Sequence, residues 1–412
     1  MKNVEKIQNS ITHLLTQKSK IDGRFFLLII LIIYFVPVII AYLSPNYPQS
    51  WKSQLVYPLV PKMLPSFADM RVITAGSECI RLGYDVLIDN PCDPWNRPMN
   101  YPPIWSILAS WGLDQSHTKM IGIVCALLFF TSIFLIIKRL NYFEALLYGS
   151  IICSPSIMLA VERGNNDLIV FVILSLSLLI MEVEYFNLSF LSLGIILFAS
   201  ILKLYPIFTI LSFLKEKKRV FIFFSLFVMT FFGVYIIANF ERIKLVSAAT
   251  PRAIRFSYGG KIIFDLFFRN LNKYPLFLLA LLSIVLISFL LVKKRNSLNN
   301  LNIERIDSFR MGASIYMGTF FIGNNWDYRL IFLIFTIPQI LLWIKYQNVI
   351  SKISSLAFMG ITATIWLSSK STSIYHLDEF INWLLFLFFT YTVILTLPVW
   401  LKRIIYRDSN IN

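Results

Sequence analysis

Metal-ligating and acidic side chains are scarce in this chain. It has 3 histidines, and His13, His117 and His376 stand far apart, so none has the spacing of a metal site. The 22 acidic residues are outnumbered by 38 lysines and arginines. We therefore expect no metal ion and no cofactor, and a chemistry that uses fixed charges of the protein itself.

Cysteine is also rare, with 4 residues in the chain. Cys125 and Cys153 lie in apolar runs and are expected in the core. Cys79 and Cys92 lie in a polar stretch, where they would form a disulfide if that stretch faces an oxidising compartment. The sequence does not show whether their Cα atoms approach, so a bonded pair and two free thiols both remain open.

Long apolar runs, by contrast, are abundant, and 57% of the residues are hydrophobic. Soluble domains have about 45–50% apolar residues. The net charge of +16 then reflects basic loops that stay on the cytoplasmic side, not a nucleic-acid partner. The composition predicts an all-α polytopic membrane protein. The clearest spanning runs are Phe25–Ser44, Thr118–Ile137, Val220–Asn239 and Leu276–Val292.

The alternation of apolar runs and basic turns predicts a single membrane domain over residues 1–412. The basic arm 1–24 is expected in the cytoplasm, and the first apolar run is expected to be retained because no small-residue cleavage site follows it. The stretch 45–101 then becomes a large first outer loop that carries juxtamembrane helices. We predict about twelve membrane helices with both termini cytoplasmic.

One of these predicted elements is a hairpin of two short helices. Phe186–Leu214 has the length of one helix, but a single crossing would place the basic cluster 215–219 outside. An unpaired Lys203 at bilayer depth would cost at least ~2.5–3.5 kcal/mol, and Pro206 interrupts helical hydrogen bonding. We therefore expect the chain to turn at Lys203–Pro206, with this tip reaching water on the outer side.

Four polar clusters fall on the outer side of this predicted topology. They are Asp69 at the start of an amphipathic run, Glu162–Asp167, Lys203–Pro206 and Asn324–Arg329. Each also has a plain structural explanation as a helix cap, a solvated turn, a snorkelling lysine or an interfacial aromatic. Their common side is what favours a functional site.

The segment 240–274 is basic although the topology places it outside. An anionic lipid or a phosphate would explain this excess of cations, and a surface helix on anionic headgroups is the alternative. Ser257–Gly260, in the middle of the segment, offers a flexible backbone that a ligand could approach closely.

These clusters, in this order, resemble the integral-membrane glycosyltransferases of the GT-C superfamily. The resemblance is strongest to bacterial polyprenol-phosphate-mannose-dependent mannosyltransferases, and weaker to the first mannosyltransferase of GPI-anchor synthesis. It rests on Asp69-Met-Arg-Val, Tyr101-Pro-Pro, Arg163-Gly-Asn and Lys203-Leu-Tyr-Pro. Relatives of the GPI type have paired acids in the first loop, whereas Phe67 occupies the second position here. This departure disfavours a donor bridged by metal and favours a single carboxylate base.

The resemblance implies an inverting, metal-independent transfer of a sugar, with mannose as the expectation from the family, from a polyprenyl phosphate. Partners would be this donor, a glycan or lipid-linked acceptor, and membrane lipids. The location would be the bacterial cytoplasmic membrane, with the site on its periplasmic side. Asp69 would be the general base. The expected phosphate-binding residues are Arg163, Lys203, Arg252, Arg255 and Arg329, and the expected sugar- or acceptor-binding residues are Glu162, Asn165, Asn166, Asp167, Tyr205 and Asp327.

Two other functions remain open at this stage. A lipid-linked oligosaccharide polymerase or ligase also has an outer site with arginines, but typically has its large loop late in the chain. A polyprenyl-lipid or solute transporter would have ionisable residues at mid-bilayer in discontinuous helices. The identity of the sugar, the acceptor and the linkage formed does not follow from the sequence.

Overall fold

The structure is a computed structural model. It describes residues 10, 13–16, 21–43, 60, 63–183, 185–251, 256–267, 274–293, 301–323, 325–345, 349–367 and 372–406. Over these ranges almost every ordered element is a helix, and the only strands form one two-residue ladder. The chain therefore has the all-α architecture of a polytopic membrane protein.

Six helical segments in the described ranges are long and apolar enough to cross a membrane. A seventh span is present if α6 (Tyr142–Ile152) and α7 (Pro155–Arg163), which are bent by 53°, count as one. The bend is at Pro155, which lacks the N–H that would continue α6. The six are η2 with α5 (Gln115–His117 and Thr118–Ile136), α10 (Lys218–Ala238), α13 (Tyr274–Lys293), η4 with α15 (Asp327–Thr336 and Ile337–Lys345), α16 (Val349–Leu367) and α17 (Thr372–Leu395).

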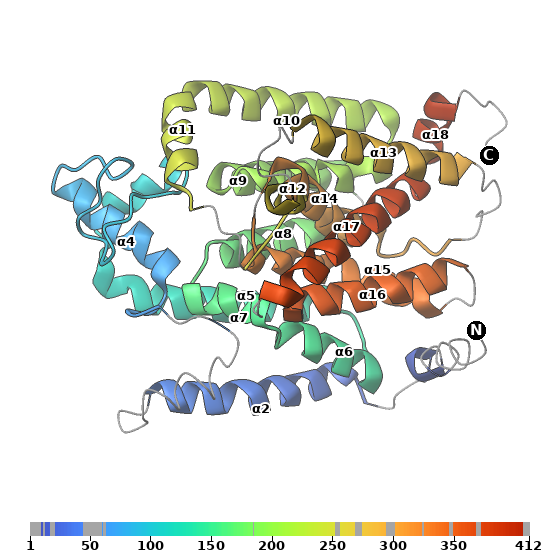
Figure 1. Ribbon diagram of the computed structural model, residues 1–412, viewed down its shortest axis with the longest axis horizontal. Helices are drawn as coiled ribbons and strands as arrows, with labels where there is room; N and C mark the ends of the chain where they lie inside the picture. The colour runs from blue at the N-terminus through green and yellow to red at the C-terminus, as the bar shows by residue number, and fades with distance from the viewer. Residues whose placement is uncertain are drawn as a thin grey trace.

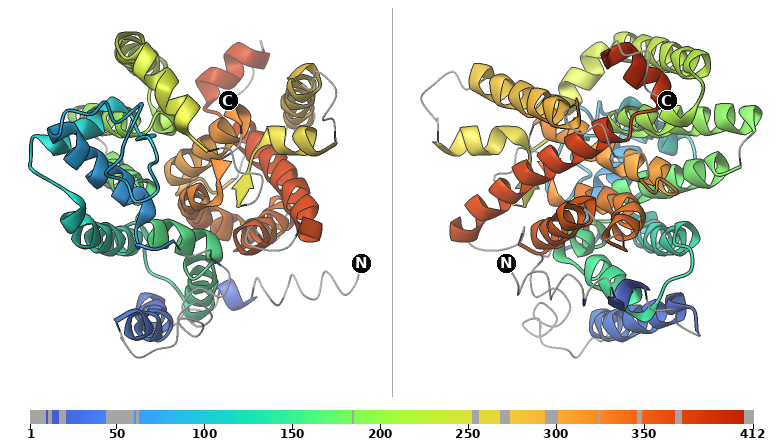
Figure 2. Two further views of the ribbon diagram at one scale, coloured as in Figure 1. Left: turned by 60° about the vertical axis from the view of Figure 1, so that its left-hand side comes forward. Right: turned by 90° about the vertical axis from the view of Figure 1, so that its right-hand side faces the viewer.

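Shorter helices fill the interior and one edge of the bundle. Helix α8 (Asp167–Met181) packs on α5 and on α9 (Phe186–Leu202). Helix α14 (Ile306–Ile322) packs on η4 and on η3 (Tyr205–Lys215). Figures 1 and 2 show α2 (Gly23–Leu43) at one edge of the molecule and α10 and α13 at the opposite edge. The layers between them carry most of the apolar core.

The predicted hairpin is present in the structure. Helices α9 and η3 pack against each other and are separated by Lys203 and Leu204. Their far ends meet, since the Ser189 hydroxyl donates to Oε1 of Glu216 at 2.9 Å. At the turn, the indole N–H of Trp105 donates to the Leu202 carbonyl at 3.1 Å, which satisfies a group that the break leaves without a helical partner.

Lys203 differs from its predicted position in one respect. The sequence suggested a tip open to water, but Lys203 is only 8% exposed. Its ammonium is covered because polar and aromatic groups from other helices close over the turn. The prediction of an exposed lysine was wrong, whereas the turn itself lies where expected.

Elements from distant parts of the chain meet at one end of the bundle. Helix α4 (Ala68–Arg81) and helix α11 (Phe240–Ala249) lie at this end, and α18 (Val399–Tyr406) lies at the other (Figure 1). Strand β1 (Ser257–Tyr258) pairs antiparallel with β2 (Asn325–Trp326). This ladder joins the segment 240–274 to the start of η4, which is one wall of the site described below.

Candidate functional site

The position of Asp69 is set by how α4 begins. Phe67 precedes the helix with a φ of 59°, and its N–H donates to the Glu162 carbonyl at 3.2 Å. The Phe67 ring lies against Gly122 and Gly164, where an added Cβ would approach it to 2.7 Å and 3.0 Å. A side chain at either glycine would displace the ring. This contact seats the first turn of α4, with Asp69, on the end of α7.

Asn165 connects Asp69 to the hairpin. Its amide donates from Nδ2 to Oδ2 of Asp69 at 2.5 Å, and its Oδ1 accepts from Nζ of Lys203 at 3.0 Å. Oδ1 also accepts the backbone N–H of Asp167 at 2.9 Å, which fixes the rotamer of the amide. Three of the predicted site residues therefore meet through one side chain.

The ionisation of Asp69 is perturbed by its surroundings. The carboxyl keeps part of its surface accessible but is packed among protein atoms, and this burial raises its pKa. The hydrogen bond from Asn165 and the charges of Arg163 and Lys203 oppose the rise without cancelling it. A carboxyl with a raised pKa is a stronger base when ionised than an ordinary surface aspartate.

Asp167 is the centre of the second half of the site. Oδ1 accepts hydrogen bonds from Nζ of Lys203 and from the Tyr205 hydroxyl, the latter at 2.7 Å. Nε of Arg329 lies 3.6 Å from Oδ2. One fully buried carboxylate thus holds two cations that come from opposite halves of the sequence. The three charges sum to +1.

Aromatic rings enclose these cations. The Arg329 guanidinium carbon lies 4.4 Å from the ring centroid of Tyr205, and Nη1 of Arg329 donates to Oδ1 of Asn325. Nζ of Lys203 lies 5.4 Å from the centroid of Tyr101 and 5.5 Å from that of Tyr328. Ring faces at these distances attract cations and keep them in place.

Glu162 and Arg163 border the site and also organise its walls. Nε of Arg163 lies 3.1 Å from Oε2 of Glu162, and Oε1 of Glu162 accepts the N–H of Met63 at 2.9 Å. Together with the bond between the Phe67 N–H and the Glu162 carbonyl, these contacts attach residues 63–67, just before α4, to α7. Glu162 therefore helps to hold residues 63–67 against α7.

Of the four remaining predicted site residues, two are buried in the structure and two lie outside the described residues. Asn166 is fully buried, and neither polar atom of its side chain has a hydrogen-bond partner among the described residues. Asp327 is also buried, at the point where β2 passes into η4, and its N–H donates to the Phe256 carbonyl at 2.8 Å. Arg252 and Arg255 lie outside the described residues.

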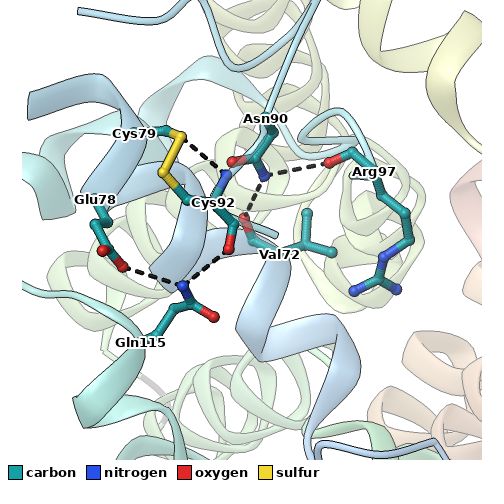
Figure 3. The surroundings of a disulfide bond; sticks show 7 residues. All are labelled: Val72, Glu78, Cys79, Asn90, Cys92, Arg97 and Gln115. Carbon is teal, nitrogen blue, oxygen red and sulfur yellow. Dashed lines mark hydrogen bonds between the residues drawn. A yellow bond between two sulfur atoms is a disulfide. The ribbon is translucent and has the colours of Figure 1, made fainter. Parts of the chain in front are cut away.

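Cys79 and Cys92 form a disulfide, with their Cα atoms 5.8 Å apart. The bond ties the end of α4 to the loop that follows it. Figure 3 shows the contacts around it: Nε2 of Gln115 donates to Oε2 of Glu78 at 3.1 Å and to the Cys92 carbonyl at 2.8 Å. The Asn90 amide donates to the Arg97 carbonyl at 3.2 Å, so hydrogen bonds as well as the disulfide hold the loop around Cys92 in place.

Arg97 links the loop that contains Cys92 to the first turn of α4. Its guanidinium forms two hydrogen bonds of 3.0 Å with the Asp93 carboxylate. Nη2 also donates to the carbonyl of Ala68, the residue before Asp69, at 2.7 Å. Sequence reasoning did not select Arg97, because nothing local distinguishes it from the other basic residues of the loop.

The residues that meet here are carboxylates, an amide and cations. No group of three or more His, Cys, Asp or Glu side chains with the geometry for a metal ion occurs among the described residues. The arrangement instead offers one carboxyl with a raised pKa beside a cation pair held by a second carboxylate. A carboxylate of this kind can accept a proton, and cations held in this way favour an anion beside them.

Comparison with known proteins identifies no relative. No family model, no curated protein and no solved structure matches the chain.

Proposed function

We propose that this protein is a metal-independent, inverting membrane glycosyltransferase of the GT-C type. It transfers a sugar, with mannose as the first candidate, from a polyprenyl phosphate to an acceptor hydroxyl at the outer membrane interface. The observation that carries the proposal is the meeting of Asp69, Asn165, Asp167, Lys203 and Arg329 at one place. They come from four separate stretches of the chain, and Asp69, Asn165 and Lys203 belong to motifs that carry the resemblance.

Asp69 would act as the general base. The Asn165 amide holds Oδ2, which orients the carboxylate and leaves Oδ1 for the acceptor hydroxyl. As the acceptor oxygen attacks the anomeric carbon, its proton passes to Asp69. The raised pKa of Asp69 favours this transfer. A single attack of this kind inverts the configuration at the anomeric carbon.

Lys203 and Arg329 would stabilise the leaving group. The bond between the anomeric carbon and the phosphate oxygen breaks, and its electron pair goes to the polyprenyl phosphate. Asp167 holds the two cations in place, and its single negative charge offsets only one of their two positive charges. Cations fixed in advance in a protected site stabilise developing charge without the cost of reorganisation.

We further propose that the chain enters the membrane with about twelve helical elements and has both termini in the bacterial cytoplasm. These elements are the long spans, the bent α6–α7 pair, and the shorter helices α2, α8, α9, η3 and α14. The Cys79–Cys92 disulfide supports placing the α4 end in the periplasm, because disulfides persist in oxidising compartments. The basic turn before α10 lies near α18, since the Trp400 indole donates to the Glu216 carbonyl at 3.2 Å.

A transporter is the alternative that one further observation favours. Asp378 and Glu379 are buried at the start of the span His376–Leu395. Buried carboxylates in membrane helices often lie on proton or ion pathways. A polymerase or ligase of lipid-linked oligosaccharides would share the outer site but would join long glycans.

The decisive experiment uses purified full-length protein and a panel of polyprenyl-phosphate sugars labelled in the sugar, with extracted cell-envelope lipids and glycans as acceptors. Transfer by the wild type and loss of transfer in Asp69→Asn are the expected results. Retained transfer in Asp69→Asn would remove the base mechanism. Transport of the labelled lipid across proteoliposomes without any new glycosidic bond would favour the transporter.

A further inference from the structure

A polar cavity of about 420 Å³ lies beside the site and extends it toward the basic segment. Its walls come from the end of α11, from α12 (Gly260–Phe267), from the start of α13 and from the turn between α14 and η4. Arg329 and Asn325 belong both to this cavity and to the site around Asp167. The two regions are therefore joined through one guanidinium group.

Lys261 is the second cation of this cavity. It is half-buried, and its Nζ lies 5.3 Å from the ring centroid of Tyr274 and 5.9 Å from that of Phe277. Its side chain also passes close to Gly323, where an added Cβ would lie 3.8 Å from Nζ. Asp265 is on the same wall, but Lys261 forms no ion pair with it or with any other described carboxylate. A half-buried ammonium without an acidic partner is set to receive an anion from outside.

The rest of the lining is apolar or carries neutral hydrogen-bonding groups. Phe264, Phe277 and Ile322 form an apolar wall next to the hydroxyl of Thr250. Helix α13 continues from this wall with side chains that face outward, namely Leu276, Leu278, Leu279 and Leu282. Because α13 is one of the apolar spans, this outward face borders hydrocarbon. The cavity thus combines two cations with apolar lining residues, one of which lies on a helix whose outward face is apolar.

We propose that this cavity binds the phosphate group of a membrane amphiphile, and that Lys261 and Arg329 are the cations that bind it. That the amphiphile is the sugar carrier rests on the function proposed above. The binding of a lipid that bears a phosphate group does not rest on that function. In this arrangement the phosphate contacts Arg329, the residue that the cavity shares with the site around Asp167.

The test measures binding to the full-length protein in detergent micelles without turnover. The probe is geranylgeranyl phosphate, and the references are geranylgeraniol and inorganic phosphate. The wild type should bind geranylgeranyl phosphate, and Lys261→Met should weaken binding by about 10-fold or more, the loss expected for one charge-assisted hydrogen bond. Lys261→Arg should restore most of the affinity.

The matched control is Lys244→Met, because Lys244 lies exposed on α11 and pairs only with Glu241, at 3.9 Å, among the described residues. It should bind as the wild type does. Equal binding by Lys261→Met and the wild type would overturn the proposal. Equal affinity for geranylgeraniol would overturn the role of the phosphate, and equal affinity for inorganic phosphate would overturn the role of the lipid tail.

The outcomes separate this cavity from the proposed function. Asp69→Asn should bind geranylgeranyl phosphate normally, since Asp69 does not line the cavity. If Lys261→Met binds normally while Asp69→Asn stops sugar transfer, the cavity assignment fails and the glycosyltransferase stands. If the wild type binds the phosphate through Lys261 but transfers no sugar from any donor, the assignment stands and the glycosyltransferase fails.

Discussion

The side-chain amide of Asn165 bridges the carboxyl of Asp69, at 2.5 Å, and the ammonium of Lys203, at 3.0 Å. Its nitrogen can serve only the acid and its oxygen only the cation, so the amide has one orientation. The proposed base and the proposed anion-binding group are therefore held in register by a single neutral residue. The contact makes Asn165 the position where a small chemical change should have the largest specific effect.

Asn165→Asp should impair transfer strongly and shift its pH dependence. The substitution keeps the size of the side chain but replaces the N–H that faces Asp69 with an oxygen. A neighbouring carboxylate disfavours ionisation of Asp69, so the acid limb of the rate profile should move up by roughly one pH unit or more. A profile of kcat/KM against pH checks this. An unchanged acid limb would mean that Asp69 is not the titrating base.

The wild-type rate should fall as the pH drops through a pKa above the usual aspartate value of 3.8. Burial raises the pKa of Asp69, and only its ionised form accepts a proton from the acceptor. The limb should disappear in Asp69→Asn, whose residual rate should be flat over the same pH range. The measurement is the initial rate at saturating donor from pH 4 to 8, a range of about four units that begins near ordinary carboxyl values and extends upward.

Asp69→Asn should melt at the same temperature as the wild type or higher near neutral pH. A folded-state pKa above the unfolded value means that protonated Asp69 stabilises the fold, and this contribution is lost as the pH rises through the folded-state pKa. The amide avoids this loss while removing the base. Thermal unfolding in detergent at pH 5 and pH 8 tests it. If Asp69→Asn melts at a lower temperature than the wild type at pH 8, ionised Asp69 stabilises the fold and this prediction is wrong.

Lys203→Met should destabilise the protein by about 3–5 kcal/mol, the cost typical of breaking a buried ion pair. Asp167 would keep Arg329 as its only cation but lose its closest partner. The double substitution Lys203→Met with Asp167→Asn should cost more than the single one, because it leaves the Arg329 guanidinium without its carboxylate partner. Where the single variant folds, kcat/KM for the donor should fall more than that for the acceptor. Equal losses would argue against a role in binding the phosphate.

Cysteine labelling should report which end of the molecule faces outward. The native thiols Cys125 and Cys153 are buried, so an added surface cysteine reacts selectively. Ser110→Cys, in an exposed turn near the α4 end, should react with an impermeant reagent in intact cells. Lys217→Cys, before α10, should react only after permeabilisation. The reverse pattern would invert the proposed topology.

The sequence was sufficient for those parts of the site that obey local rules. A single crossing by the run 186–214 would have placed the basic cluster 215–219 outside. This cluster, together with Lys203 and Pro206, predicted a turn inside the apolar run, and the structure has that turn. Asp69 and Asn165 were singled out because polar groups collected on one predicted side, and they are in contact. Orientation rules and the cost of buried charge were enough for both predictions.

Other parts depend on contacts between distant segments and could not be read from the sequence. Lys203 was expected in water because its place in an apolar run would otherwise put an unpaired charge in the bilayer. The sequence does not show that the carboxylate of Asp167 lies beside Lys203 and makes its burial tolerable. Arg97 and Lys261 carried no local signal that separated them from other basic residues. The pairing of β1 with β2 involves only two residues from each strand, too few for a recognisable alternation.

The hairpin of α9 and η3 also has a consequence for biosynthesis. Chains emerge from the ribosome from the N-terminus, and Asp167 precedes Lys203 by 36 residues. The helix that bears the carboxylate is thus already made when the short hairpin is inserted, and the lysine can be neutralised on arrival. Arg329 is made much later, so the ion pair between Lys203 and Asp167 can form before the third charge of the cluster is synthesised.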